Sequence, residues 1–193
     1  MKKIVTTYYL EMNAPHEFKP SEGYKELLEL KPISMDLFQH WMLFVGVGLP
    51  WRWYSRLKWT PADWDEYLSK NNISTYLAFG KTSLVGYFEL FSGENNAVEI
   101  RFFGLFPSSI GKGFGGALLS HALDMAWSSG AEKVWLHTCT SDHEAALSNY
   151  MARGFKLVKE TVEEEDIPDK EEYLELVNTF MSSYIDTQKN FLK

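Results

Sequence analysis

Residues 110–116 read Ile-Gly-Lys-Gly-Phe-Gly-Gly, so four glycines stand within six positions. The residues before this segment, 97–106, have the alternating pattern of a strand, and those after it have the apolar spacing of a helix. Glycines leave the backbone N–H groups free to approach a ligand, and a helix N-terminus carries the positive end of the helix dipole. A flexible turn between strand and helix is the alternative, but a turn needs fewer glycines. The segment therefore predicts a site for a phosphate or pyrophosphate.

Two common phosphate-binding motifs do not fit this glycine loop. A P-loop requires Ser or Thr after its lysine, whereas Lys112 is followed by Gly113. The spacing of the glycines satisfies a dinucleotide-binding pattern, but residues 107–110 separate the loop from its strand. The next strand also ends in His137-Thr138 and not in the acidic residue that binds a ribose. We therefore do not expect an ATPase or a dinucleotide-dependent oxidoreductase.

The pattern along the chain predicts a mixed α/β protein. Three strands with short connections predict an antiparallel meander, and the strand–helix–strand alternation after it predicts some parallel pairing. A capping-box sequence at residues 141–144 predicts the start of a helix. The expected elements are strand 4–11, helices 35–44 and 61–70, strands 75–79, 84–91 and 97–106, a helix to 129, strand 133–138, helix 141–153 and strand 155–162.

A second motif follows the predicted strand 133–138. It consists of spaced residues on and just after the predicted helix, namely His143, Ala146, Tyr150, Gly154 and Phe155. Together with the glycine loop, which comes after a strand ending in Leu-Phe-Pro at 105–107, this motif resembles the two sequence motifs of the GNAT superfamily of acetyl-CoA-dependent N-acetyltransferases. The resemblance covers about residues 75–160.

The sequence departs from the family pattern at three places. Ile110 stands where the family usually has Arg or Gln, and His143 stands where it usually has Asn. The family also commonly ends with one more strand, whereas the tail here has helical spacing. The sheet therefore ends at strand 155–162 or is completed by another segment.

The resemblance implies a fold, a co-substrate and a set of residues that bind it. The implied fold is a mixed, mostly antiparallel twisted sheet with helices on both faces and splayed central strands. The implied co-substrate is acetyl-CoA. The residues that the resemblance assigns to binding it are Phe103, Leu105, Ile110, Gly111, Lys112, Gly113, Phe114, Gly115, Gly116, His143 and Ala146.

Acetyl transfer from a thioester to an amine requires a proton acceptor for the amine and a proton donor for the departing thiolate. The resemblance makes Tyr150 the donor, with a core tyrosine as the alternative. It makes Glu99 the general base, with Glu89 as its rival and an ion pair between Glu99 and Arg101 as the structural alternative. Strand alternation predicts that Glu99, Arg101, Phe103 and Leu105 share one face.

Other reactive side chains give weaker signals. His137 and Cys139 share one strand face, which would suit a nucleophile pair, but acetyl transfer needs no covalent intermediate. His137 is otherwise a proton relay near the acceptor or a hydrogen-bonded strand residue. The single cysteine excludes an internal disulfide, and no histidine has metal-ligand spacing, so we expect no metal.

The acceptor side is the least defined. Five of the seven tryptophans fall between residues 41 and 64, where aromatic walls could bind an amine or could serve only as packing. We expect a small-molecule or peptide amine as acceptor, attacking directly in a ternary complex. The alternative function is a non-catalytic sensor of CoA or acyl-CoA with the same fold.

The charge of the chain is concentrated in its last part. Residues 160–193 hold 10 acidic and 3 basic side chains, which leaves 16 of each among residues 1–159. Without a basic stripe we expect no nucleic-acid partner, and without a long apolar run we expect no membrane span and a cytoplasmic location. We expect one acetyltransferase domain at 1–162 and an acidic helical extension at 163–193, which packs on the domain, forms a homodimer or covers the substrate.

Overall fold

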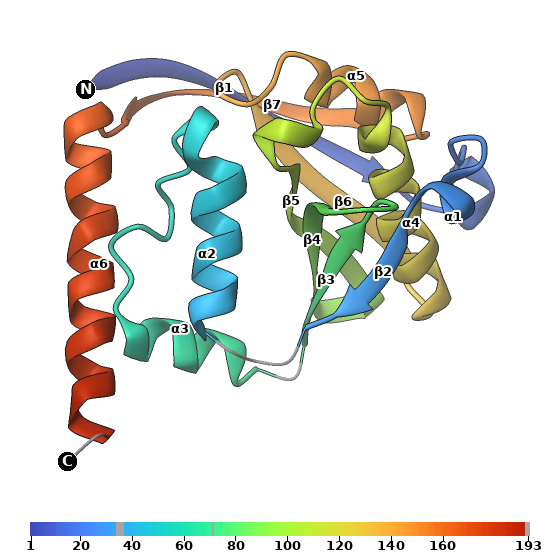
Figure 1. Cartoon of the computed structure of the whole chain (residues 1–193). Helices are drawn as coiled ribbons and strands as arrows, with labels where there is room; N and C mark the ends of the chain where they lie inside the picture. The colour runs from blue at the N-terminus through green and yellow to red at the C-terminus, as the bar shows by residue number, and fades with distance from the viewer. Residues whose placement is uncertain (34–36, 71, 192–193) are drawn as a thin grey trace. The chain divides into compact units, whose positions relative to one another are not determined.

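The computed structural model describes residues 1–33, 37–70 and 72–191 (Figure 1). Within these residues the strands are β1 Lys2–Met12, β2 Glu29–Pro32, β3 Ile73–Phe79, β4 Leu84–Ser92, β5 Ala97–Leu105, β6 Lys133–Cys139 and β7 Lys156–Asp166. The α-helices are α1 Tyr24–Leu27, α2 Leu37–Gly48, α3 Pro61–Leu68, α4 Phe114–Ser128, α5 Ala145–Ala152 and α6 Lys170–Phe191.

The chain divides into two compact units. The sheet unit comprises residues 5–34 and 72–163, and the helical unit comprises residues 1–4, 35–71 and 164–193. The tail thus belongs to one unit with residues 35–71. The predicted boundary between residues 162 and 163 stays a prediction.

The sheet has the strand order β2-β3-β4-β5-β6-β1-β7. Strands β3 to β5 form the predicted antiparallel meander, and β2 pairs antiparallel with β3 at its edge. Strands β5 and β6 are parallel, and β6 and β1 are antiparallel. The mixed, mostly antiparallel fold is therefore confirmed. The N-terminal strand β1 lies between β6 and β7, so it completes the sheet and the C-terminal segment is not needed for this purpose. The sequence reasoning missed β2, a four-residue edge strand.

The central strands β5 and β6 separate, as predicted. They pair in parallel only where residues 97–99 of β5 meet residues 133–135 of β6. Beyond Glu99 and Trp135, β5 continues to Leu105 and β6 continues to Cys139 without a paired register. We call the point after the Glu99–Trp135 pair the fork.

A β-bulge in β5 changes which residues share a face. Glu89 is opposite Phe102 and Leu90 is opposite Ile100, so Arg101 is the extra residue on β5. Phe103 is opposite Phe88, and both rings pack with the core under α4. The prediction that Glu99 and Phe103 share one face is therefore wrong: Phe103 faces α4, and Glu99 faces away from it.

Helix α4 packs an apolar stripe against the sheet. Its fully buried apolar residues are Ala117, Leu118, Leu119, Ala122, Leu123 and Ala126. These positions recur at three and four residues, which places them on one stripe of the helix. Gly130, at φ +87°, follows the helix end as the sequence predicted.

The helical unit is built from α2, α3 and α6. Thr60 and Asp63 form a reciprocal capping box at the start of α3. Helix α2 extends to Gly48, four residues past its predicted end. Its predicted start at residue 35 lies outside the described residues. Residue 71, at the predicted end of the α3 segment, also lies outside them. Trp41 of α2 stacks on Phe180 of α6, with ring centroids 4.5 Å apart. Aromatic packing therefore links the tail to the segment around the first tryptophans.

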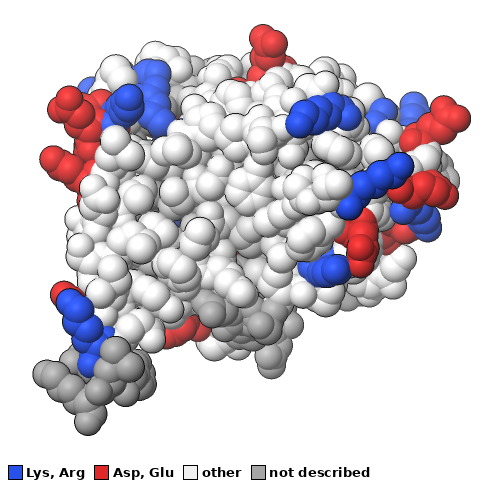
Figure 2. Space-filling view, viewed as in Figure 1, with Lys and Arg blue, Asp and Glu red and all other residues white. Residues whose placement is uncertain are grey.

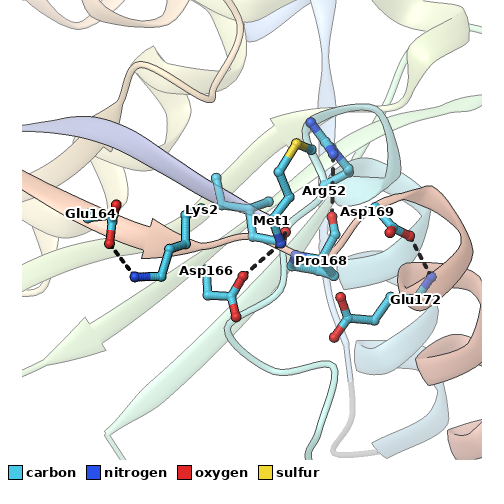
Figure 3. Close-up of polar contacts among 9 residues, drawn as sticks. Met1, Lys2, Arg52, Glu164, Asp166, Pro168, Asp169 and Glu172 are labelled. Carbon is cyan, nitrogen blue, oxygen red and sulfur yellow. Dashed lines mark hydrogen bonds and ion pairs between the residues drawn. The ribbon is translucent and has the colours of Figure 1, made fainter.

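The N-terminus meets the segment before α6 in the helical unit (Figure 3). The nitrogen of Met1 lies 2.7 Å from Asp166 Oδ1, and Lys2 Nζ lies 2.6 Å from Glu164 Oε2. Asp169 Oδ1 accepts hydrogen bonds from the N–H groups of Glu171 and Glu172, each at 2.9 Å, and so caps α6. The acidic segment before α6 therefore pairs with the N-terminus of the chain and caps the helix.

Charged side chains are scattered over the face drawn in Figure 2. Lys and Arg stand in small groups among uncharged residues, and the described residues visible there form no continuous basic stripe. Among the described residues, no helix is long and apolar enough to cross a membrane.

Candidate active site

The glycine loop joins β5 to the N-terminus of α4. Gly111 and Gly113 have φ values of +77° and +81°, in the left-handed region that favours glycine. Gly113 is the N-cap of α4 and has no side chain to bond the first-turn N–H groups. A Cβ at Gly111 or Gly113 would meet nothing within 4 Å, and the exposed loop includes Lys112. The first turn of α4 can therefore accept an anion.

The other residues of the predicted loop have different surroundings. Ile110 is half-buried at the end of a short 3-10 turn, and Phe114 packs its ring near Gly80, between β3 and β4. Gly115 lies beside Leu105, the last residue of β5, and accepts a hydrogen bond at its carbonyl from Asn149 Nδ2 at 3.3 Å. The end of β5, the loop and α5 are thus in direct contact.

Arg153 lies against the first turn of α4. A Cβ on Gly116 would collide with Arg153 Nη1, so the guanidinium occupies the space that the glycine leaves. Arg153 Nε is buried without a hydrogen-bond partner. The sequence reasoning missed this residue, because an arginine at the end of α5 shows its relation to Gly116 only after α5 has packed on α4.

Helix α5 starts later than its sequence predicted. The capping-box prediction is wrong, because α5 begins at Ala145 and Glu144 is its N-cap without a side-chain hydrogen bond. Asp142 instead accepts hydrogen bonds from Thr138 Oγ1 at 2.7 Å and from the Cys139 N–H at 3.1 Å. Asp142 therefore closes the end of β6.

The two other motif residues on this segment lie before and on α5. His143 Nδ1 accepts a hydrogen bond from the N–H of Ala145 at 3.0 Å. Ala146, which is half-buried, packs against the core under α4. His143 therefore bonds the first helical amide of α5.

Tyr150 is held between two aromatic rings on the α4 face of the sheet. Its ring meets Phe103 and Phe155 edge to face, with centroid distances of 5.9 and 6.3 Å. The residue is 7% exposed. Burial raises the pKa of Tyr150 far above that of an ordinary phenol, and the negative charge of Asp142 adds to this effect. The phenol therefore stays protonated and can act as a donor.

Glu99 lies at the fork on the opposite face. Arg101 donates to Glu99 Oε2 from Nε at 2.9 Å and from Nη2 at 2.7 Å, and the Arg101 guanidinium stacks on Phe91. The ion pair that was the structural alternative is therefore present. Glu89, the rival base, is buried in β4 opposite Phe102 on the same face as Glu99.

The structure brings together some predicted site residues and not others. Phe103, Leu105, Gly115 and Tyr150 form a continuous group on the α4 face beside the loop. Glu99 is not part of this group, because the bulge leaves it on the other face of the sheet. Among the described residues, no cluster of three or more His, Cys, Asp or Glu side chains is placed to hold a metal ion.

The comparisons with solved structures agree with this fold. A GCN5-related N-acetyltransferase from Kribbella flavida is 16% identical with a TM-score of 0.59, over 87% of this chain and 61% of that one. A Bacillus subtilis acetyltransferase in complex with CoA is 23% identical with a TM-score of 0.53, over 68% and 78%. The aminoglycoside acetyltransferase meta-AAC0020, from an uncultured soil metagenomic sample and in complex with trehalose, is 16% identical with a TM-score of 0.54, over 66% and 88%.

These similarities concern the fold, and the chain spans about three fifths of the length of the Kribbella flavida protein. No curated protein matches the sequence. The model of the acetyltransferase (GNAT) family matches residues 35–155, which is more than half of the chain and includes the glycine loop, the fork and Tyr150. The chain belongs to the GNAT acetyltransferase family.

Proposed function

We propose that the protein transfers the acetyl group of acetyl-CoA to a primary amine of a small molecule or peptide, by direct attack of the amine in a ternary complex. One observation carries the proposal above the others: the uncapped, glycine-lined N-terminus of α4 adjoins the separated strands and a buried tyrosine. The structurally similar acetyltransferase in complex with CoA supports the choice of co-substrate.

The glycine loop and the fork would hold different parts of the co-substrate. The first-turn N–H groups of α4 would bind the pyrophosphate, with the dipole of a 15-residue helix behind them. Beyond the fork, the edge of β5 that has turned away from β6 would bind the extended pantetheine arm as a strand does. The residues proposed to line this path are Phe103, Leu105, Ile110, Gly111, Lys112, Gly113, Phe114, Gly115, Gly116, His143 and Ala146.

Arg153 would give the co-substrate's phosphates a positively charged partner, which the apolar Ile110 cannot provide. The family usually has Arg or Gln at the position of Ile110, and the guanidinium of Arg153 lies beside Gly116 in the same first turn. A guanidinium forms charge-assisted hydrogen bonds with phosphate oxygens. We therefore add Arg153 to the residues that bind the co-substrate.

Tyr150 is the proposed general acid. Its ring contacts Phe103, which belongs to the part of β5 that has separated from β6. The thioester would lie along this part of β5. The phenol is protonated at neutral pH and can give its proton to a thiolate that forms next to it. A main-chain N–H near Phe103 to Leu105 would stabilise the oxyanion.

Glu99 is the proposed base, and Glu89 remains its rival. Glu99 lies at the fork, within reach of an acetyl group held between β5 and β6, and Arg101 fixes its carboxylate. The amine therefore approaches from the face opposite Tyr150. Proton removal and proton donation would occur on the two sides of the thioester.

The acceptor class rests on the family alone. The aminoglycoside acetyltransferase among the similar structures makes polyamine sugars a reasonable first set of acceptors. The tryptophans of residues 41–64 contribute less than the sequence suggested, because Trp41 and Trp64 are buried and Arg56 lies against the Trp59 and Trp64 rings. The cytoplasm is the proposed location, and sedimentation would test a homodimer.

A screen of amines with acetyl-CoA tests the proposal. We expect free thiol to appear above the hydrolysis background with at least one amine, and both acetyl-CoA and CoA to raise the melting temperature. The second candidate is a CoA sensor, which the ion pair on Glu99 and the presence of Ile110 favour. Thermal shifts by CoA and acetyl-CoA without thiol release from any amine would support the sensor, and no shift at all would contradict both.

A further inference from the structure

Three side chains with charge or titratable groups meet at the fork, on the face opposite α4. Glu99 is the last residue of β5 that pairs with β6, and Arg101 is the bulged residue two positions further on. His137 lies two residues past Trp135, the last residue of β6 that pairs with β5. All three belong to the sheet unit. They come from two parallel strands at the point where these strands separate.

The carboxylate of Glu99 divides its two oxygens between two partners. Arg101 Nε and Nη2 both donate to Oε2, at 2.9 and 2.7 Å. Oε1 is turned toward the imidazole of His137, whose Nδ1 lies 3.9 Å away. Catalytic hydrogen bonds are often long before substrate binds, and a small side-chain rotation would close this one.

Glu99 and His137 differ in how far their side chains are exposed to solvent. The Glu99 side chain is 6% exposed, whereas the His137 side chain is 49% exposed. An amine can therefore reach the imidazole more readily than it can reach the carboxylate. The carboxylate is suited to orient the ring, as acidic residues orient histidines in many active sites.

We infer that His137 is the group that takes the proton from the acceptor amine, and that Glu99 acts through it as a positioning residue held by Arg101. The inference rests on the proposed function and assigns the order of the groups within it. A Glu99 carboxylate next to Nδ1–H leaves Nε2 as the acceptor and stabilises the imidazolium that forms.

The proton balance of the step is complete. The ammonium of the acceptor gives one proton to His137 Nε2, and its nitrogen attacks the thioester carbonyl. The C–N bond forms, the C–S bond breaks, and the sulfur takes a proton from Tyr150. The attached nitrogen loses its second proton to solvent, His137 gives its proton to solvent, and Tyr150 takes one proton back from solvent. One proton is therefore released in the whole reaction.

Two aromatic rings flank the imidazole of His137 on this face. Tyr9 of β1 lies with its ring centroid 5.9 Å from the imidazole, and Trp135 of β6 lies at 6.5 Å. Other charged groups on this face are Arg101, bonded to Glu99, and Lys159, whose Nζ lies 5.2 Å from the Tyr9 ring centroid. Glu11 and Lys133 pair with one another at 3.1 Å, and Glu89 is buried in β4. Of the described groups named here, Glu99 is the one that can balance an imidazolium.

The test compares three variants with wild type in acetyl transfer to one amine from the screen. In His137→Gln we expect kcat/KM at pH 7 to fall about 100-fold, the typical share of general base catalysis. We expect the loss to shrink as pH rises and the amine deprotonates without help, and CoA affinity to stay within about twofold. Glu99→Gln should lose rate with the same pH dependence, and the double variant should lose no more than His137→Gln.

A control and a rescue experiment separate chemistry from structure. Glu11→Gln removes a carboxylate from β1 on the same sheet face, where Glu11 lies opposite Trp135 and pairs with Lys133 at 3.1 Å, and it should leave the rate unchanged. Added imidazole should restore part of the activity of His137→Ala, which a structural role would not allow. A His137→Gln rate equal to wild type, with Glu99→Gln alone impaired, would overturn this inference and keep the proposed function. A wild type that transfers acetyl to no amine would overturn both.

Discussion

The rings of Tyr150 and Phe103 meet edge to face, with planes at 62° and centroids 5.9 Å apart. Phe103 lies on β5 beyond the fork, and Tyr150 lies on α5, so this contact joins the separated strand to the helix of the second motif. The bulge at Arg101 makes the contact geometrically feasible, because it turns Phe103 toward the α4 face. The phenol is thereby positioned beside the strand that the thioester would follow.

Replacement of Tyr150 by Phe tests the general acid. We expect kcat to fall by about 10² or more, while the affinity for CoA changes little, because the substitution removes only the hydroxyl. Thiol release and equilibrium binding of CoA measure the two quantities. Tyr173→Phe, which removes the hydroxyl of a buried tyrosine in the helical unit, is the matched control and should keep full activity. An unchanged kcat in Tyr150→Phe would exclude this role.

Replacement of Arg153 by Met tests the phosphate contact. We expect the Kd for CoA to rise by about 10- to 100-fold, because a hydrogen bond to a charged group contributes about 1.5–3 kcal/mol. Calorimetric titration measures this change. Lys25→Met removes a positive charge near the middle of α4, where Lys25 pairs with Asp124, and should leave the Kd nearly unchanged. Equal effects of both variants would mean that net charge, and not the position of Arg153, determines affinity.

Replacement of Gly154 by Ala tests a close backbone contact. Gly154 has φ +108°, and a Cβ there would collide with the backbone carbonyl oxygen of Glu17, which cannot move as a flexible side chain could. We expect the free energy of unfolding to fall by about 3 kcal/mol or more, measured in urea. Gly130→Ala is the control, because φ is +87° but nothing lies within 4 Å of the new Cβ. Gly130→Ala should lower the free energy of unfolding by only about 1 kcal/mol. Similar losses of this free energy in both variants would contradict the steric argument.

The tyrosines predict a loss of stability at alkaline pH. Burial raises the pKa of Tyr173 to about 12 and also raises that of Tyr150, with the charge of Asp142 as a second cause there. Above about pH 10 an unfolded chain releases these protons while the folded chain keeps them. The unfolded state then binds fewer protons, so stability falls as pH rises past 10, and it is unaffected by these groups below that pH.

Urea denaturation at pH 8 to 11.5 measures this dependence. In Tyr173→Phe the free energy of unfolding should fall less steeply above pH 10 than in wild type. The variant lacks one of the two phenols whose protons the folded chain keeps and the unfolded chain releases. A decline that is as steep in this variant as in wild type would show that other groups cause it.

The sequence alone predicts the type and place of most elements. The glycine loop, the meander of β3 to β5 and the helix at 114–128 follow from local spacing and from residues with strong backbone preferences, which act over a few positions. The second motif follows from the same kind of local spacing, with Ala146 and Tyr150 four residues apart on α5 and His143 and Gly154 on either side of it. The predicted capping box at 141–144 failed because Asp142 is used by Thr138 and Cys139 at the end of β6.

Tertiary structure decided the relations that the site depends on. The bulge at Arg101 turned Glu99 and Phe103 to opposite faces, and β1 entered the sheet between strands that follow it by more than 100 residues. Packing of α5 on α4 brought Arg153 to Gly116, and the short pairing of β5 with β6 brought His137 to Glu99. Spacing along one segment describes only that segment, whereas each of these contacts depends on how distant segments pack, and so no local pattern in the sequence could show it.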